Sequence, residues 1–203
     1  LAMTHMAALG VSGLDLYSEE GGAFRWAGSA RPGGPENQAV MIKALDADRR
    51  RRHYMLYLPL YNGVESVRIG LSPGARLAKA PPYPHGTKPI VFYGTSIVQG
   101  GCASRPGLAY TAIIARTLRM PHINLGFSGN GPTELELARL MTELEASVYV
   151  LDSLPNTNLA QLKERMEPFV TILRAARPDV PIILVEQGVP QSLLRGVRNS
   201  GYR

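Results

Sequence analysis

From residue 88 onward, short apolar runs alternate with longer segments in which apolar residues recur every three or four positions. The short runs are rich in β-branched residues and predict buried strands at 89–93, 122–126, 147–152 and 181–186. The periodic segments predict helices at 108–118, 133–144 and 159–176. Strands that alternate with helices are typical of a parallel sheet covered by helices. This part of the chain is therefore predicted to be an α/β domain.

The first 80 residues have a different pattern, without helical periodicity. Four segments rich in β-formers are separated by turn residues and predict strands at 13–18, 38–45, 53–60 and 65–71. The segment Arg31–Asn37 (RPGGPEN) breaks regular structure, and Ala80–Lys88 (APPYPHGTK) reads as a stiff, proline-rich linker. We therefore predict a small, all-β, sandwich-like domain at 1–80, a linker at 81–88 and the α/β domain at 89–203.

Polar, glycine- or asparagine-bearing turns follow the first three strands of the α/β domain. Ser96 follows the first strand in Gly-Thr-Ser, Gly129 follows the second, and Asn156 follows the third. Because such turns meet at one edge of a doubly wound sheet, these residues are expected to surround one carbonyl group. A serine nucleophile with nearby N–H donors is an arrangement suited to acyl transfer. Gly-Thr-Ser also fits a plain helix cap, whereas a phosphate-binding loop would need a lysine that is missing here.

The ordered set Gly-Thr-Ser96, Asn-Leu-Gly-Phe-Ser-Gly129 and Leu-Pro-Asn156 resembles the first three sequence blocks of the SGNH (GDSL-type) hydrolases. The upstream string GLDLY (13–17) resembles a subfamily with a small β domain before the hydrolase domain. The resemblance implies a flavodoxin-like, three-layer fold, with Ser96 as the nucleophile. It also implies that the Gly129 backbone and the Asn156 side chain bind the oxyanion. Thr95 stands where the family has aspartate.

Several neighbouring residues have two interpretations. Asn130 is a rival of Asn156 as oxyanion donor and, with Thr95 and Arg105, a candidate for substrate binding. Arg105 is equally consistent with pairing to a nearby carboxylate. Asp15 in GLDLY is interpreted as a residue of domain packing rather than as an acid.

The last block of the family, Asp-x-x-His, supplies the general base, and it is absent from this sequence. The four histidines (His5, His53, His85 and His122) all precede Asn156, and none lies three residues after an aspartate. We therefore expect a chain that is incomplete at its C-terminus, and at its N-terminus because it begins with Leu1. Two functions follow: a serine ester hydrolase that forms an acyl-enzyme on Ser96, or a non-catalytic binding or structural module on the same scaffold.

Composition limits the classes of partner and the cellular locations that we expect. The 203 residues carry a net charge of +6, but the basic run Arg49–Arg52 lacks interleaved aromatic residues, so no nucleic-acid partner is expected. No apolar run is long enough to cross a membrane, and one cysteine excludes a disulfide framework. The resemblance implies no cofactor or metal and a small-molecule or carbohydrate ester as substrate, such as an acetylated sugar. A cytoplasmic location is favoured; a secreted or periplasmic one stays open if a leader was lost, and the oligomeric state is left undetermined.

Overall fold

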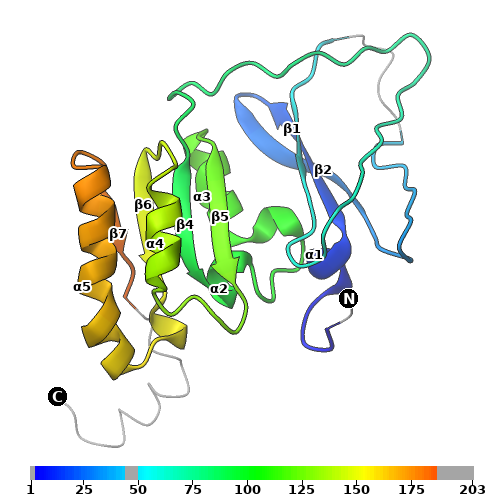
Figure 1. Cartoon of the computed structure of the whole chain (residues 1–203). Coiled ribbons are helices and arrows are strands. Elements are labelled where there is room, and N and C mark those ends of the chain that lie inside the picture. The colour runs from blue at the N-terminus through cyan, green and yellow to red at the C-terminus, as the bar shows by residue number, and fades with distance from the viewer. Residues whose placement is uncertain (1–2, 44–49, 187–203) are drawn as a thin grey trace, which may run out of the picture.

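The computed structural model describes residues 3–43 and 50–186, which form two sheets joined by a long connection (Figure 1). The larger sheet is parallel, with the order β5-β4-β6-β7. Its strands are β4 (Ile90–Thr95), β5 (His122–Phe127), β6 (Val148–Asp152) and β7 (Ile182–Leu184). Its helices are α2 (Ser96–Gln99), α3 (Tyr110–Leu118), α4 (Leu135–Met141) and α5 (Leu159–Ala176), with 3-10 turns η1 (Pro106–Leu108) and η2 (Leu154–Asn156).

Helices cover both faces of the parallel sheet, so alternate residues of each strand enter different cores. On one face, Tyr93 and Tyr149 pack with Phe169 of α5 and with α4. On the other face, Phe92 and Val98 pack with the start of α3. The three-layer α/β prediction is therefore confirmed, and the strand order is that of a flavodoxin-like sheet.

The N-terminal sheet is antiparallel, with the order β2-β1-β3. It contains β1 (Leu14–Glu20), β2 (Ala23–Ala30) and β3 (Tyr54–Tyr57), and it follows the short helix α1 (Ala8–Ser12). Gly21 and Gly22 both have positive φ and form the two-residue turn between β1 and β2. This conformation gives a hairpin the right-handed twist of its strands, and glycine adopts it at little cost.

Two of the four strands predicted for the N-terminal region were wrong, and one strand was missed. Residues 38–43 and 65–71 form no strand, while residues 44–45 lie outside the described part of the chain. Strand β2 escaped prediction because its sequence, AFRWAGSA, contains small residues of low β-propensity. The Gly21-Gly22 pair was the signal that could have revealed it.

A buried carboxylate joins the two sheets. Asp15 of β1 is fully buried and accepts hydrogen bonds from Trp26 Nε1 (2.9 Å) and Ser29 Oγ (3.0 Å) on β2. It also accepts bonds from the Gly107 N–H (3.1 Å) and Arg105 Nε (3.3 Å), which belong to the α/β unit. The Arg105 guanidinium lies over the Trp26 ring, 5.1 Å from its centroid. We call Asp15, Trp26, Arg105 and Gly107 the Asp15 junction, and the predicted packing role of Asp15 agrees with these contacts.

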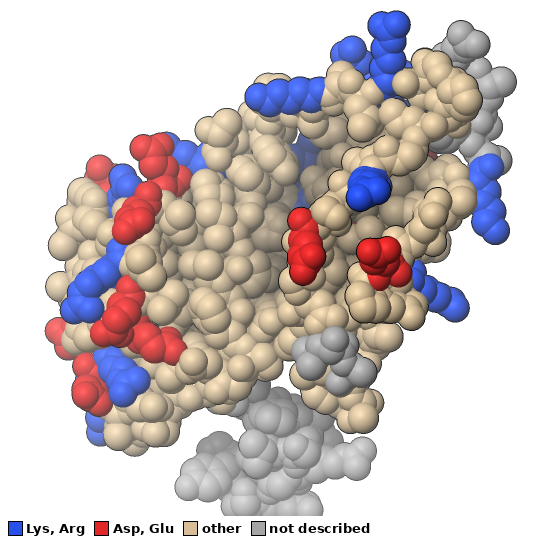
Figure 2. Space-filling view, turned by 45° about the vertical axis from the view of Figure 1, so that its right-hand side comes forward, with Lys and Arg blue, Asp and Glu red and all other residues tan. Residues whose placement is uncertain are grey.

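The surface drawn in Figure 2 has positive and negative side chains interspersed at its left-hand end, whereas the middle of this face carries little charge. Among the described residues, no helix is both long and apolar enough to cross a membrane.

Candidate active site

Ser96 lies where β4 ends and α2 begins. All six residues of β4 are buried, and Thr95 caps the helix by accepting a hydrogen bond from the Ile97 N–H at 3.3 Å. Because Ser96 is half-buried and directly follows this rigid strand, its position is fixed by the core while its side chain remains accessible. Its hydroxyl makes no hydrogen bond within the described residues, so it is free to meet a substrate or a base.

The Gly129 loop follows β5 and lies against the end of β4. Gly129 has a φ of +72° and is exposed, and its N–H has no acceptor in the described part of the chain. A Cβ on Gly131 would lie 2.4 Å from the Gly94 carbonyl oxygen, so this loop is in backbone contact with the end of β4. The loop that carries the Gly129 donor thus lies against the end of the strand that Ser96 follows.

Asn156 lies on η2, after β6, and its side chain turns toward the Gly129 loop. Its Nδ2 donates to the carbonyl oxygen of Asn130 at 2.7 Å. A side-chain amide has two N–H groups, so this bond orients Asn156 and leaves its second N–H available. Asn130 takes part through its backbone. The three turns predicted to converge are therefore linked, from Gly94 to Gly131 and from Asn130 to Asn156.

Two tyrosines, the buried Tyr93 and the half-buried Tyr110, hold these turns to the sheet. Tyr93 of β4 donates to Glu134 Oε2, and the Glu134 N–H donates back to the Tyr93 hydroxyl at 3.2 Å, which fixes the end of the Gly129 loop. Tyr110 of α3 donates to Asp152 Oδ2 at 2.9 Å, which fixes the end of β6. Burial, together with the adjacent carboxylate, raises the pKa of each phenol above its usual range. Both hydroxyls therefore remain protonated donors at neutral pH.

The structure places the other predicted residues elsewhere. Thr95 is fully buried and its hydroxyl serves as the cap of α2, so it does not face a ligand. Arg105 is turned toward Asp15 and Trp26 in the Asp15 junction, which is the carboxylate pairing that the sequence left open. Sequence reasoning missed Gln99, whose amide reaches both Ser128 and Leu60. No spacing signal could have revealed these contacts, because they join three segments far apart in the sequence.

None of the four histidines forms a hydrogen bond with Ser96 in the described structure. His53 pairs with Glu19 at 3.0 Å, and His85 is exposed in the linker. His122 begins β5 and pairs in register with Ile90, at the opposite end of the strand from Ser96. Five residue steps along a strand correspond to about 16 Å. Through its backbone oxygen, His5 accepts a bond from the Cys102 thiol at 3.6 Å.

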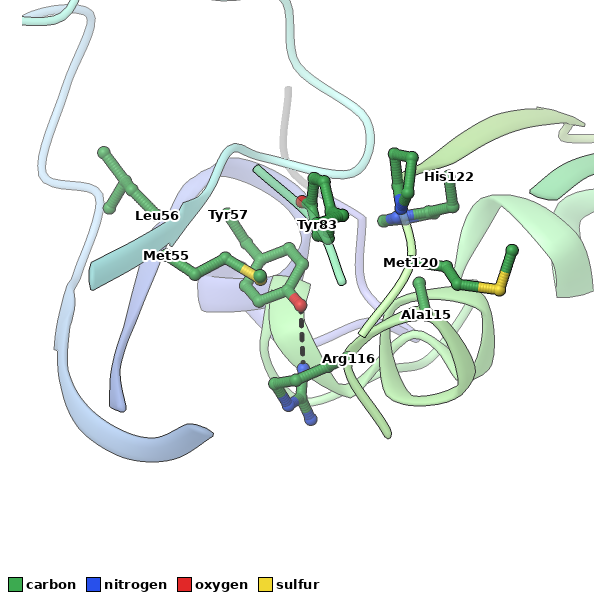
Figure 3. Close-up of a pocket in the computed structure, with 9 residues that line it drawn as sticks. Met55, Leu56, Tyr57, Tyr83, Ala115, Arg116, Met120 and His122 are labelled. Carbon is green, nitrogen blue, oxygen red and sulfur yellow. Dashed lines mark hydrogen bonds between the residues drawn. The ribbon is translucent and has the colours of Figure 1, made fainter. Parts of the chain in front are cut away.

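A cavity of about 250 Å³ lies beside His122, at the edge of the sheet remote from Ser96 (Figure 3). Its lining includes Met55 and Tyr57 of β3, Arg116 of α3, and Met120, which follows α3. Arg116 Nη1 donates to the Tyr57 hydroxyl at 3.0 Å (Figure 3). Burial, and to a lesser degree the Arg116 charge, lowers the pKa of His122 below its ordinary value. We assign this cavity to the contact between the two units, because the three convergent turns lie at the other end of the strands.

Comparison with known proteins identifies the family. The GDSL-like lipase/acylhydrolase family model matches residues 87–198, which is more than half of the chain. The chain belongs to the GDSL-like lipase/acylhydrolase family. The model for the N-terminus of SGNH-hydrolase-type esterases matches residues 1–77, in agreement with the GLDLY resemblance. Within the described residues, no group of three histidine, cysteine or acidic side chains could hold a metal ion.

Two solved structures resemble this GDSL-like chain. A candidate GDSL-like lipase of Bacteroides ovatus ATCC 8483 is 37% identical, with a TM-score of 0.84, over 91% of this chain and 53% of that protein. The salicylyl-acyltransferase SsfX3, from a tetracycline biosynthetic pathway, has the same fold, with a TM-score of 0.53 and 22% identity over 94% of this chain and 60% of that protein. The chain thus spans little more than half of either protein. No curated protein matches it.

Proposed function

We propose that this GDSL-like chain carries the nucleophile and oxyanion-binding part of a serine ester hydrolase. Ser96 Oγ attacks the ester carbonyl while its proton passes to a general base, which then gives that proton to the leaving alkoxide, so the alcohol departs and the acyl group stays on Ser96. Water, deprotonated by the same base, attacks the acyl carbonyl; the acid is released and the proton returns to Ser96 Oγ. The oxyanion accepts hydrogen bonds from the Gly129 and Ser96 N–H groups and from the second N–H of Asn156.

The observation that carries this proposal is the linkage of the three turns. The Gly129 N–H and the Ser96 hydroxyl have no partner within the described residues, the loop of Gly129 lies against the end of β4, and Asn156 donates to that loop. N–H donors that point to one place stabilise the negative charge that develops there in the transition state. The relative described as a candidate lipase supports an ester as the substrate class. Small acyl groups, such as acetyl on a carbohydrate, are our proposal for the natural substrate.

The alternative is a non-catalytic binding module. It is favoured by one observation, that no histidine of the described chain forms a hydrogen bond with Ser96. A serine without a base is a weak nucleophile. The two functions therefore differ in whether the Ser96 hydroxyl reacts.

Hydrolysis of p-nitrophenyl acetate by the chain and by its Ser96→Ala variant distinguishes them. An active site predicts that Ser96→Ala loses at least about a thousandfold in kcat/KM. Ser66→Ala is a matched control at an exposed serine outside the three turns, and it should keep the wild-type rate. Equal background rates from folded wild-type and Ser96→Ala samples would contradict hydrolysis by this chain and favour the binding module.

A further inference from the structure

Gln99, the last residue of α2, connects two segments that the catalytic turns do not otherwise join. Its Oε1 accepts a hydrogen bond from the Ser128 N–H at 2.8 Å. Its Nε2 donates to the carbonyl oxygen of Leu60 at 3.1 Å. The bond to Leu60 is partly buried, whereas the bond to Ser128 is exposed to solvent. One amide thus links the nucleophile helix to the loop after β5 and to the N-terminal unit.

On one side, Gln99 restrains the loop that carries the proposed oxyanion donor. Ser128 immediately precedes Gly129, and its N–H is held by Gln99 while the Gly129 N–H stays unpaired. The end of β5 runs directly against α2, because a Cβ on Gly126 would lie 2.0 Å from the Gln99 backbone nitrogen. Because α2 and β5 approach so closely, the Gln99 amide restrains the two residues after Gly126, where the chain leaves β5.

On the other side, Gln99 is held by a fixed part of the N-terminal unit. The Leu60 N–H donates to the Gly10 oxygen at 3.2 Å, and the Tyr61 N–H donates to the Val11 oxygen at 3.3 Å, so α1 holds this segment. A Cβ on Gly100 would lie 2.7 Å from Leu60 Cδ1, which shows that Leu60 packs against the end of α2. The Leu60 carbonyl is therefore a rigid acceptor.

We propose that Gln99 is a positioning residue that aligns the Gly129 N–H with Ser96, and that the N-terminal unit contributes to this alignment through Leu60. The inference rests on the proposed function. An oxyanion donor stabilises the transition state only when it lies about 2.7–3.1 Å from the oxygen, so a small shift of the loop lowers the rate. Because the oxyanion forms only in the transition state, the loss should appear in kcat and not in KM.

Two substitutions separate the two bonds of Gln99. Gln99→Met keeps the length of the side chain and removes both bonds. Gln99→Glu keeps an acceptor for the Ser128 N–H and removes the donor to Leu60. In hydrolysis of p-nitrophenyl acetate, Gln99→Met should lower kcat by about tenfold or more with KM within about twofold, and Gln99→Glu should fall between it and wild type. Gln38→Met changes an exposed glutamine in the same way and should leave both constants unchanged.

Hydrogen exchange tests the alignment without relying on turnover. In Gln99→Met, the Ser128 amide should exchange faster than in wild type, and in Gln38→Met it should not change. If a folded Gln99→Met protein keeps both the wild-type kcat and the wild-type exchange of this amide, the inference is overturned. If wild type shows no Ser96-dependent hydrolysis, the proposed function fails separately. Exchange at Ser128 then decides whether Gln99 holds the loop, and unchanged exchange would refute it.

Discussion

The two sheets of this GDSL-like chain are stabilised in different ways. In the parallel sheet, every residue of β4 is buried, and its side chains enter a core on each face. In the N-terminal sheet, no residue of β3 is fully buried, and β2 buries only Gly28 and Ala30. The parallel sheet therefore contains its own core, whereas the N-terminal sheet must find much of its burial elsewhere.

Two buried side chains of the N-terminal sheet, Asp15 and Tyr17, contact the α/β unit. Asp15 binds the Gly107 backbone, and the Tyr17 ring lies under the Arg116 guanidinium, 4.1 Å from its centroid. A second ion pair crosses between the units, from Arg119 at the end of α3 to Glu19 at 2.7 Å. Hydrogen bonding by His53, and then the Arg119 charge, lowers the pKa of Glu19. The segment between α2 and β5 therefore also supports the N-terminal sheet.

Of the variants that test this difference between the two sheets, Asp15→Asn is expected to lose the most stability. An asparagine keeps the shape but presents two donors among groups that already donate, and it leaves Arg105 without its counter-charge. Breaking a buried pair in this way should destabilise the protein by about 3 kcal/mol. Trp26, the single tryptophan, reports the N-terminal sheet by fluorescence, while far-ultraviolet circular dichroism reports mainly the helices of the α/β unit.

In urea, the fluorescence transition of Asp15→Asn should move to lower denaturant further than the dichroism transition does. Asp179→Asn changes an exposed aspartate and should move neither. If both signals of Asp15→Asn shift together, the two sheets unfold as one unit and the N-terminal sheet is not separately dependent on Asp15.

A smaller effect is expected from Gly10→Ala, which tests backbone contact between the units. A Cβ at Gly10 would lie 2.2 Å from the Ala103 carbonyl oxygen, so α1 must move away from the loop after α2. Forced displacements of this kind cost about 1–3 kcal/mol. Gly63→Ala is the matched control, because a Cβ there meets nothing within 4 Å.

Thermal unfolding should therefore show a lower Tm for Gly10→Ala and none of that loss for Gly63→Ala. The direction of the change in Tm is informative. Gly10 lies in α1 and alanine is the better helix former, so the substitution would raise the Tm if the new Cβ met no obstacle. A rise in Tm for Gly10→Ala would mean that α1 and the loop after α2 are not in contact.

The same difference explains what the sequence could predict. Segments of the parallel sheet have strong patterns because each contributes to a local core: Leu159–Ala176 was predicted with the bounds that α5 has, and β4, β5 and β6 differ from their predictions by a few residues at most. The β-formers at 65–71 predicted a strand, but in the structure that segment pairs with no strand of the described residues. Alternation describes which residues a strand would bury, and a strand forms only when a partner edge exists.

For the candidate site, sequence order and strand ends predict that the turns carrying Ser96, Gly129 and Asn156 meet, because parallel strands place their following turns at one edge. In the structure, Gly131 lies against Gly94, and Asn156 donates to the Asn130 carbonyl oxygen. The Asp15 hydrogen bonds and the Gln99 bridge could not be predicted in detail. They connect residues up to 92 positions apart, and a single sequence contains no signal for such pairings.

The smallest effect on stability is expected at His122, which lines the cavity between the two units, and it depends on pH. His122 has its pKa lowered from 6.5 by burial and by Arg116, so the folded protein binds a proton at this site less readily than the unfolded chain does. The stability it contributes is therefore complete above pH 6.5 and is lost as pH falls through the lowered pKa.

Between pH 7.5 and 5.5, the free energy of unfolding of wild type should decline more than that of His122→Phe, which keeps the ring contact with Phe92. His85→Phe, at an exposed site, should follow wild type. Parallel curves for wild type and His122→Phe would mean that the imidazole titrates as freely in the folded protein as in the unfolded chain, and this side of the contact would then be open to water.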